Sequence, residues 1–303
     1  MSGRVGVVVL NWNGGAHTIT CVDSVRAQEY TERFIVLVDN CSVLEERAQL
    51  WARYGGDAQV EILQLPENRG YAGGNNAGIA RALARGADLV LVATQDVTLL
   101  PGALAGLIET AAAEPRAGIV GPQVIDAAGR HVLSRGERVS AATLCVPRTL
   151  LRYRHARSPY YEVTGVMGCA LLLTRSCVEA VGAFDEQFFA YYEEVDLCLR
   201  ARKQGFRIVC TPHAVVTHPG MRGFRSGFTA VSAELKARNL PRLMYRWAGP
   251  ADWIVLLPTY AALLAASIVL YAARGRMDIV RALIRGTIAG LRQGPLGAAV
   301  RAS

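Results

Sequence analysis

Residues 5–13 read VGVVVLNWN, a short run of apolar, mostly β-branched side chains that ends in a polar turn. Runs of this length and composition are typical of buried strands. No small-residue cleavage site follows a long apolar region here, so we interpret the segment as a strand rather than a signal peptide. The turn Asn11-Trp12-Asn13 then places polar groups directly after the strand.

Similar apolar segments recur along the first part of the chain, with helix-length stretches between them. They cover residues 34–38, 60–65 and 89–93, and this alternation predicts βαβ units. A further helix is predicted over 101–113 and a further strand over 117–125. We therefore expect an α/β fold with a mainly parallel, Rossmann-like sheet flanked by helices.

Ligands of such sheets bind beyond the carboxyl ends of the strands, so the residues after each strand are the first candidates for a site. Polar turns follow four strands: Asn11-Trp12-Asn13, Asp39-Asn40-Cys41-Ser42, Glu67-Asn68-Arg69-Gly70 and Thr94-Gln95-Asp96. One such turn could be ordinary turn chemistry. Together the four outline a polar crevice.

A glycine-rich segment, NRGYAGGNNAG at 68–78, leads into a predicted helix. Closely spaced glycines let backbone N–H groups approach a phosphate or a ribose. The segment lacks the G-x-G-x-x-G spacing of a dinucleotide site, which argues against an NAD-dependent dehydrogenase.

The net charge of +8 is distributed unevenly. Residues 222–303 hold 12 basic and 3 acidic side chains, a net charge of +9, whereas the preceding residues carry −1. A uniformly basic protein would suggest nucleic acid, which we do not expect as a partner here. A basic, apolar tail favours an anionic membrane surface, and a merely solvated tail is the alternative.

The segment Trp253 to Ala273 is 21 residues long and has no charged side chain. This length suffices to cross a bilayer core of about 30 Å as a helix. Pro258 near its start and its many alanines fit a shallow or re-entrant membrane segment equally well. Soluble packing or the interface of a homo-oligomer is the alternative.

Several ordered stretches resemble the family 2 glycosyltransferases of the GT-A fold, and within them the rhamnosyltransferase-like branch that builds bacterial polysaccharides. They are VVVLNWNG at 7–14, VDNCS at 38–42, ENRGYAGGNNAGI at 67–79, GAFDEQFFAYYEEVDLCLRARKQGFRI at 182–208 and VVTHPG at 215–220. The resemblance implies an inverting enzyme with a pyrimidine nucleotide sugar donor, dTDP-rhamnose being favoured and a UDP-sugar next. The implied acceptor is a hydroxyl group of a lipid-linked saccharide.

The resemblance also implies which residues bind the donor. Asn11, Asp39 and Asn68 would line the nucleotide pocket, with Asp39 facing the pyrimidine base or its ribose. Gly70 and Asn75 of the glycine-rich segment would complete the donor site. An ordinary turn or helix cap is the alternative role for each of the first three.

The implied metal ligands are Asp96 and His218, which would hold Mn²⁺ or Mg²⁺. Family members usually carry two acidic or amide residues flanking one position after the fourth strand, whereas Asp96 is the only carboxylate of Thr94-Gln95-Asp96. His218 matches a histidine that several relatives use as a further ligand, and imidazole suits manganese better than magnesium. A structural histidine is the alternative.

The implied catalytic base is Glu194, which occupies the place of the aspartate usual in the family. A solvated acidic helix start is the alternative, because carboxylates favour helix N-termini. Asp196 lies two residues further on, and we expect it to be a structural partner of Arg200 at i+4.

We therefore expect a GT-A catalytic domain over residues 1–222 and a helical, membrane-docking tail over 223–303. The seven cysteines are odd in number and form no C-x-x-C pair, which favours reduced, buried thiols in a cytoplasmic protein. The expected location is the inner face of the cell membrane, peripheral or integral. The alternatives are a related transferase with a soluble acceptor and a catalytically weakened sugar-nucleotide binding protein.

Overall fold

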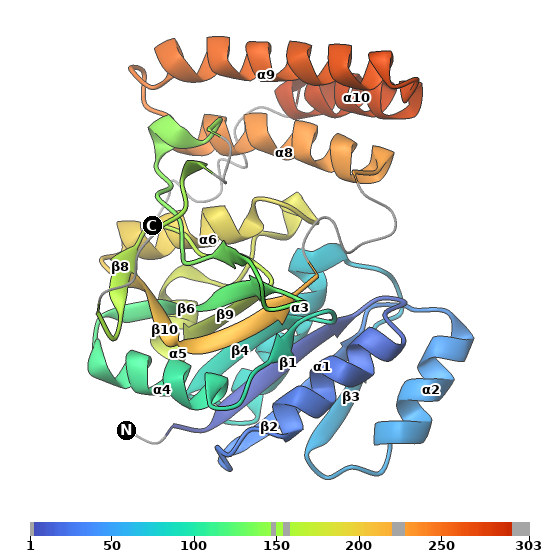
Figure 1. The fold of residues 1–303 in the computed structure, drawn as a ribbon, viewed down its shortest axis with the longest axis vertical. Helices are drawn as coiled ribbons and strands as arrows, with labels where there is room; N and C mark the ends of the chain where they lie inside the picture. The colour runs from blue at the N-terminus through green and yellow to red at the C-terminus, as the bar shows by residue number, and fades with distance from the viewer. Residues whose placement is uncertain (1–2, 147–149, 154–157, 220–227, 293–303) are drawn as a thin grey trace.

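The computed structural model describes residues 3–146, 150–153, 158–219 and 228–292. Its centre is a ten-stranded sheet with the order β3-β2-β1-β4-β9-β6-β10-β5, in which β7 pairs with β6 and β8 with β10 (Figure 1). The strands are β1 (Val5–Asn11), β2 (Arg33–Asp39), β3 (Val60–Gln64), β4 (Leu89–Thr94), β5 (Thr98–Leu99), β6 (Ala117–Asp126), β7 (Val132–Ser134), β8 (Tyr161–Val163), β9 (Ala170–Thr174) and β10 (Arg207–His218).

The first half of the sheet is parallel, because β3, β2, β1 and β4 all run in one direction. The predicted strands are found here, and the α/β expectation is confirmed. Beyond β4 the sheet is mixed, since β9 runs antiparallel to both β4 and β6. In the register, Asn11 pairs with Asp39 and Leu10 with Thr94, so three strands end at one edge.

Helices cover both faces of the sheet (Figure 1). They are α1 (Ala16–Arg26), α2 (Leu44–Tyr54), α3 (Gly70–Ala84), α4 (Ala103–Ala113), α5 (Arg175–Val181) and α6 (Glu193–Lys203), with short 3-10 turns η1 (Ala141–Thr143) and η3 (Glu186–Phe188). Alternate residues of β1 enter opposite cores, as a pleated strand requires. Val7 and Val9 pack with α1, α2 and α4, whereas Val8 and Leu10 pack with α3, α5 and α6.

The expected helical tail is confirmed as three stacked helices, α8 (Ala230–Trp247), α9 (Trp253–Ala273) and α10 (Met277–Arg292). Figure 1 shows α8 between the catalytic sheet and the other two. Leu243 of α8 shares a core with Leu199 of α6 and Leu256 of α9. The expected division at 222 and 223 falls outside the described residues and stays a prediction, but α8 packs directly on the catalytic part.

Candidate active site

Asn11 ends β1 and organises the turns at the carboxyl edge of the sheet. Its Nδ2 donates to Asp39 Oδ1 at 3.1 Å and to Ser42 Oγ at 2.9 Å. Its Oδ1 accepts from the Gly14 N–H at 3.2 Å and from the Thr18 hydroxyl at 2.5 Å. The side chain is fully buried and its hydrogen-bonding capacity is used within the protein. Asn11 therefore holds the neighbouring carboxylate and both turns in place.

Asp39 ends β2 and is only 1% exposed. Its Oδ2 lies 3.0 Å from Arg47 Nε of α2, a contact that sequence reasoning missed because nothing marks this arginine within its helix. The contact is not aligned as a hydrogen bond, and Oδ2 has no other hydrogen-bond partner among the described residues. This oxygen is therefore a buried acceptor that is ion-paired with Arg47 and has no aligned hydrogen bond.

Asn68 and Gly70 lie where the glycine-rich segment meets the same edge. Asn68 Oδ1 accepts from Asn40 Nδ2 at 2.9 Å and from the Gly70 N–H at 2.8 Å. Gly70 has φ of +69°, and a Cβ there would collide with the carbonyl oxygen of Phe189. Only glycine allows this close approach, which brings the loop before α6 against the start of α3.

Asn75 lies in the interior of α3 rather than in the crevice. It is fully buried, and its Nδ2 donates to the Tyr71 carbonyl at 2.9 Å. Its Oδ1 has no hydrogen-bond partner among the described residues. Its expected contact with the donor stays a prediction, because none of its surface is accessible in this structure.

Asp96 and His218 come together at the carboxyl edge, with 3.2 Å between Oδ2 and Nε2. Pairing of β5 with β10 brings the two turns together. The Thr94 hydroxyl donates to Asp96 Oδ1 at 2.6 Å, which fixes the carboxylate. Burial acts to raise the pKa of Asp96, but the hydrogen bond and charge of His218, together with the Thr94 bond, outweigh it and lower the pKa.

This pair has the chemistry of a partial metal site. Adjacent ligands of an octahedral ion with bonds of about 2.1 Å lie about 3 Å apart, close to the observed separation of Asp96 and His218. Their side chains are 6% and 15% exposed, so the two atoms are held in a partly desolvated place. The described residues hold no group of three or more His, Cys, Asp or Glu side chains around one point. A cation here would need oxygen atoms from substrate and water.

Glu194 lies in the first turn of α6 and is half-buried, whereas its neighbour Glu193 is only 4% exposed. A Cβ placed on Gly168 would lie 3.3 Å from Glu194 Cγ, so the side chain rests against the segment that enters β9. The two adjacent carboxylates therefore differ in exposure to solvent. Glu193 is buried, whereas Glu194 is partly exposed and lies against the segment that enters β9.

Cys169 links Glu194 to the Asp96 turn. Its carbonyl accepts from the Thr94 N–H at 2.9 Å. Burial raises the pKa of the Cys169 thiol, and the charges of Asp96 and, to a smaller extent, Glu194 raise it further. Glu194 therefore rests against Gly168, and the next residue, Cys169, is hydrogen-bonded to the strand end that leads to Asp96.

A family model described as "Glycosyl transferase family 2" matches residues 6–182. The chain belongs to this family. An N-acetylglucosaminyl-diphospho-decaprenol L-rhamnosyltransferase of Mycobacterium tuberculosis is 32% identical over 238 residues, covering 72% of this chain and 76% of that protein. A low-salt glycan biosynthesis hexosyltransferase of Haloferax volcanii is 28% identical and covers 57% of this chain and 54% of that protein. These relatives confirm the expected rhamnosyltransferase-like branch of the family.

Solved structures confirm the expected GT-A fold of this glycosyltransferase. A mannosyltransferase from Pyrobaculum calidifontis, in complex with GDP-Man and Mn²⁺, aligns with a TM-score of 0.61 at 18% identity, covering 96% of this chain and 88% of that one. GalNAc-T7 with UDP, GalNAc and Mn²⁺ aligns with a TM-score of 0.58 at 14% identity, covering 78% and 51%. At these identities the likeness concerns the fold alone.

Gln95 has a local role in this glycosyltransferase. Its Oε1 accepts from the Trp12 N–H at 2.7 Å, and its Nε2 donates to the Trp12 carbonyl at 3.3 Å. The amide therefore ties the turn after β4 to the turn after β1, which a carboxylate could not do with both atoms. The Trp12 side chain is 53% exposed beside these turns.

Asp196 is the structural partner of Arg200, as expected for an i+4 pair on a helix. Its Oδ2 lies 2.7 Å from Arg200 Nε, and its Oδ1 accepts from Trp247 Nε1 at 2.9 Å. The carboxylate is fully buried. It joins α6 to α8 and is not accessible to substrate.

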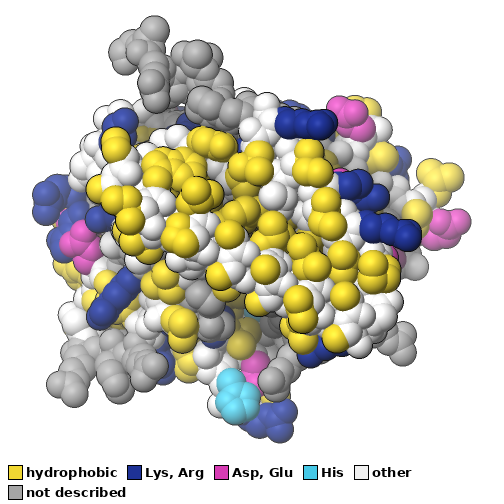
Figure 2. All heavy atoms as spheres, turned by 90° about the horizontal axis from the view of Figure 1, so that it is seen from above, with side chains coloured by type: hydrophobic (Ala, Val, Ile, Leu, Met, Phe, Trp, Pro, Cys, Tyr) yellow, Lys and Arg dark blue, Asp and Glu magenta, His cyan; other side chains and the backbone are white. Residues whose placement is uncertain are grey.

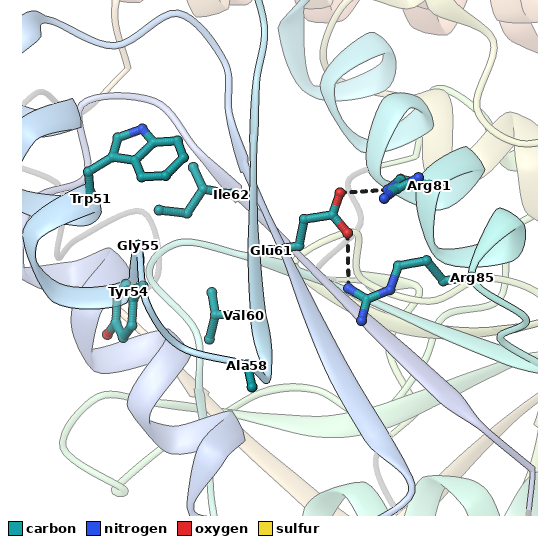
Figure 3. A pocket seen from close by; sticks show the side chains of 9 residues that line it. All are labelled: Trp51, Tyr54, Gly55, Ala58, Val60, Glu61, Ile62, Arg81 and Arg85. Carbon is teal, nitrogen blue, oxygen red and sulfur yellow. Dashed lines mark hydrogen bonds and ion pairs between the residues drawn. The ribbon is translucent and has the colours of Figure 1, made fainter.

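A hollow of about 500 Å³ lies elsewhere in the glycosyltransferase, around the edge strand β3 (Figure 3). Val60 and Ile62 face one side of the strand, whereas Glu61 points to the other, toward Arg81 at 2.6 Å and Arg85 at 3.0 Å. The lining residues therefore lie on both sides of β3. No predicted site residue lines it, and it is not part of the candidate active site.

Proposed function

We propose that this chain is an inverting glycosyltransferase that moves rhamnose from dTDP-rhamnose, or a sugar from a UDP-sugar, to a hydroxyl of a lipid-linked saccharide in polysaccharide synthesis. The observation that supports the proposal is the Asp96 and His218 pair at the carboxyl edge of the sheet, with Glu194 resting against the segment whose Cys169 carbonyl binds the end of β4. The similarity to an N-acetylglucosaminyl-diphospho-decaprenol L-rhamnosyltransferase over 72% of the chain supports this donor and acceptor class.

In this proposal, the donor nucleoside binds against Asp39. Its Oδ2 lies 3.0 Å from Arg47 Nε but has no hydrogen bond among the described residues, and it would accept one from the base or the ribose. Asn11 would act by holding Asp39 Oδ1 in position. Asn68 and Gly70 would line the adjoining side of the pocket.

Asp96 and His218 would hold Mn²⁺ or Mg²⁺, as their separation allows. When bound, the ion neutralises negative charge that develops on the leaving diphosphate. The chain's own contribution is to orient the carboxylate, because the Thr94 hydroxyl engages Oδ1 and leaves Oδ2 facing the imidazole.

Glu194 would take the proton from the acceptor hydroxyl as that oxygen attacks the anomeric carbon. The new carbon–oxygen bond forms on the face opposite the diphosphate while the bond to the diphosphate oxygen breaks. This single displacement inverts the anomeric centre and needs no covalent intermediate.

The acceptor would be presented at a membrane, through the outer face of α9 and α10. Figure 2 shows hydrophobic side chains gathered across this face, with basic side chains around its rim. Its exposed apolar residues are Ile254, Val255, Leu257, Leu263, Val269, Leu270, Met277, Ile284, Ile288 and Leu291. Exposed arginines on the same part of the chain are Arg274, Arg276, Arg281, Arg285 and Arg292. A large apolar patch with a basic rim fits an anionic lipid surface.

The length and composition of α9 would allow it to cross a bilayer. Its packing favours a helix that lies flat, because residues along its length contact the helices beneath it. Leu256 and Tyr260 are buried against α8, and Leu264 and Ile268 are partly buried further along. We therefore propose a peripheral enzyme at the cytoplasmic face of the membrane, which agrees with seven cysteines that are all free.

Donor binding tests the proposed function directly. A thermal-shift screen of nucleotide sugars should show that dTDP-rhamnose with Mn²⁺ raises Tm by about 5 °C at saturating concentration, since a ligand at 100 times its Kd adds about 2.7 kcal/mol. A transfer assay with a lipid-linked saccharide should then show product. A donor that binds but is neither transferred nor hydrolysed would support the binding-protein alternative.

Membrane docking should depend on the outer face of α9. Full-length protein is expected to sediment with anionic liposomes at low salt. The double variant Ile254→Glu/Val269→Glu should partition at least about tenfold less, because burying one such side chain contributes about 1.5–3 kcal/mol. Leu44→Glu on α2 is the matched control, since Leu44 and Ile254 are both 76% exposed.

The control variant is expected to sediment like the unaltered protein. If the unaltered protein stays in the supernatant, the membrane proposal fails, and a soluble acceptor or an oligomer interface becomes the better explanation of the apolar face.

A further inference from the structure

The loop that leads into α6 has a backbone shape that few residue types adopt. Phe189, Tyr191 and Tyr192 all have positive φ values, of 64°, 73° and 75°. Such values are uncommon for residues other than glycine and persist where the surrounding structure holds them. Glu194 follows two residues later, so the shape of this loop sets where the proposed base lies.

Asn239 of α8 supplies that support. It is fully buried, and its Nδ2 donates to the carbonyls of Phe188 at 2.8 Å, Ala190 at 2.8 Å and Tyr191 at 3.0 Å. Arg238 Nε donates to its Oδ1 at 3.0 Å, which fixes the orientation of the amide. One side chain thus contacts three carbonyls of the loop whose residues have positive φ values.

Two arginines on the same face of α8 bind η3 and the residue before it. Arg242 Nη1 donates to the Gln187 carbonyl at 2.8 Å, and Arg246 Nη1 lies 2.7 Å from Asp185 Oδ2. Residues 238, 242 and 246 are four apart and share one helix face. These arginines therefore face the catalytic part of the chain and not the membrane.

The opposite side of the loop is held by α3. The Ala72 N–H donates to the Phe189 carbonyl at 3.0 Å, and Arg69 Nη2 lies 2.8 Å from Glu186 Oε2. The loop is thus fixed between the glycine-rich segment on one side and α8 on the other.

We propose that Asn239 is a positioning residue for catalysis, which acts by holding the 188–192 loop so that Glu194 faces the acceptor. This inference rests on the proposed role of Glu194 as the base. Asn239 touches neither donor nor acceptor, so its effect appears in turnover and not in donor binding. Displacement of a catalytic group by about 1 Å can cost as much as about 100-fold in rate.

A double-mutant cycle tests this role in the full-length protein. Asn239→Ala is expected to lower kcat by about tenfold or more with the donor KM unchanged. In the Glu194→Gln background, the same substitution should lower kcat by less than about twofold, because a misplaced base matters only when the base is present. If Asn239→Ala is insoluble, Asn239→Ser retains one donor and gives the same comparison with a smaller loss.

Tyr260→Phe on the neighbouring helix α9 is the matched control. The Tyr260 hydroxyl contacts the Ala237 carbonyl at 3.3 Å and the Thr287 hydroxyl at 2.9 Å, both away from the loop. Its loss should lower Tm without lowering kcat. An equal loss from Asn239→Ala in both backgrounds, or an unchanged kcat, would overturn the positioning role while Glu194 remains the base. Full turnover by Glu194→Gln alone would instead overturn the base assignment and, with it, this inference.

Discussion

Glu194→Gln is expected to lower kcat by about 100-fold or more while the donor KM barely changes. Glutamine keeps the size and hydrogen bonding of glutamate but cannot accept the proton of the acceptor hydroxyl. The proposed donor pocket includes the ends of β1 and β2, so its affinity should not depend on this side chain. Initial-rate measurements with varied donor and saturating acceptor would give both constants.

Two further variants test whether Glu194 is the base. Glu194→Asp retains a carboxylate, the residue type usual in the family, and should keep far more activity than the glutamine variant. Glu193→Gln should affect stability more than turnover, because Glu193 is only 4% exposed. A greater loss of turnover from Glu193→Gln would move the base by one residue.

The strands that form the candidate site could be predicted because their apolar runs are short, β-branched and followed by polar turns. Val5 to Leu10 is completely buried except for a small part of Leu10, as its composition indicates. The parallel register then brings Asn11 beside Asp39, as the rule for strand ends requires. The local sequence was sufficient to predict these strands, because the apolar run of each strand and the polar turn after it lie within a few residues of each other.

The antiparallel direction of β9 could not be predicted, because an apolar run such as 170–174 indicates burial and not direction. The role of Asn239 was hidden for another reason: its three acceptors lie 48 to 51 residues earlier in the chain. Its partners are backbone carbonyls, which every residue type carries. No residue pattern therefore marks the contact.

Charge along the chain also gave an incomplete description of the tail. The count over 222–303 treats every arginine alike, whereas Arg238, Arg242 and Arg246 point toward the catalytic part of the chain. Their guanidinium groups bind backbone carbonyls and carboxylates there. Among the described residues of the tail, the arginines around α9 and α10 remain for the proposed lipid surface, so the electrostatic share of the proposed membrane binding is smaller than +9 suggests.

Asp96→Ala is expected to lower turnover by about 1000-fold, equivalent to about 4 kcal/mol of transition-state stabilisation, if a divalent ion neutralises the leaving diphosphate. The variant removes one of the two proposed protein ligands, and with so few ligands among the described residues substrate oxygens should not fully compensate. Manganese-dependent donor binding, measured by calorimetry, should disappear with it. His218→Ala should have a smaller effect, since a water molecule can take the place of the imidazole as a ligand.

Asp126→Asn is the matched control for Asp96→Ala, because it removes a negative charge near His218 without removing a proposed metal ligand. Asp126 ends β6 beside His218 in the register, yet its carboxylate accepts from the Arg130 N–H at 2.7 Å within its own turn. This variant should retain both activity and its response to manganese. Chelation by EDTA should reduce the unaltered enzyme to the level of Asp96→Ala and leave that variant unchanged, because both treatments remove the same interaction. Full activity in EDTA would exclude the metal role and leave Asp96 and His218 as a structural pair that supports the turn after β4.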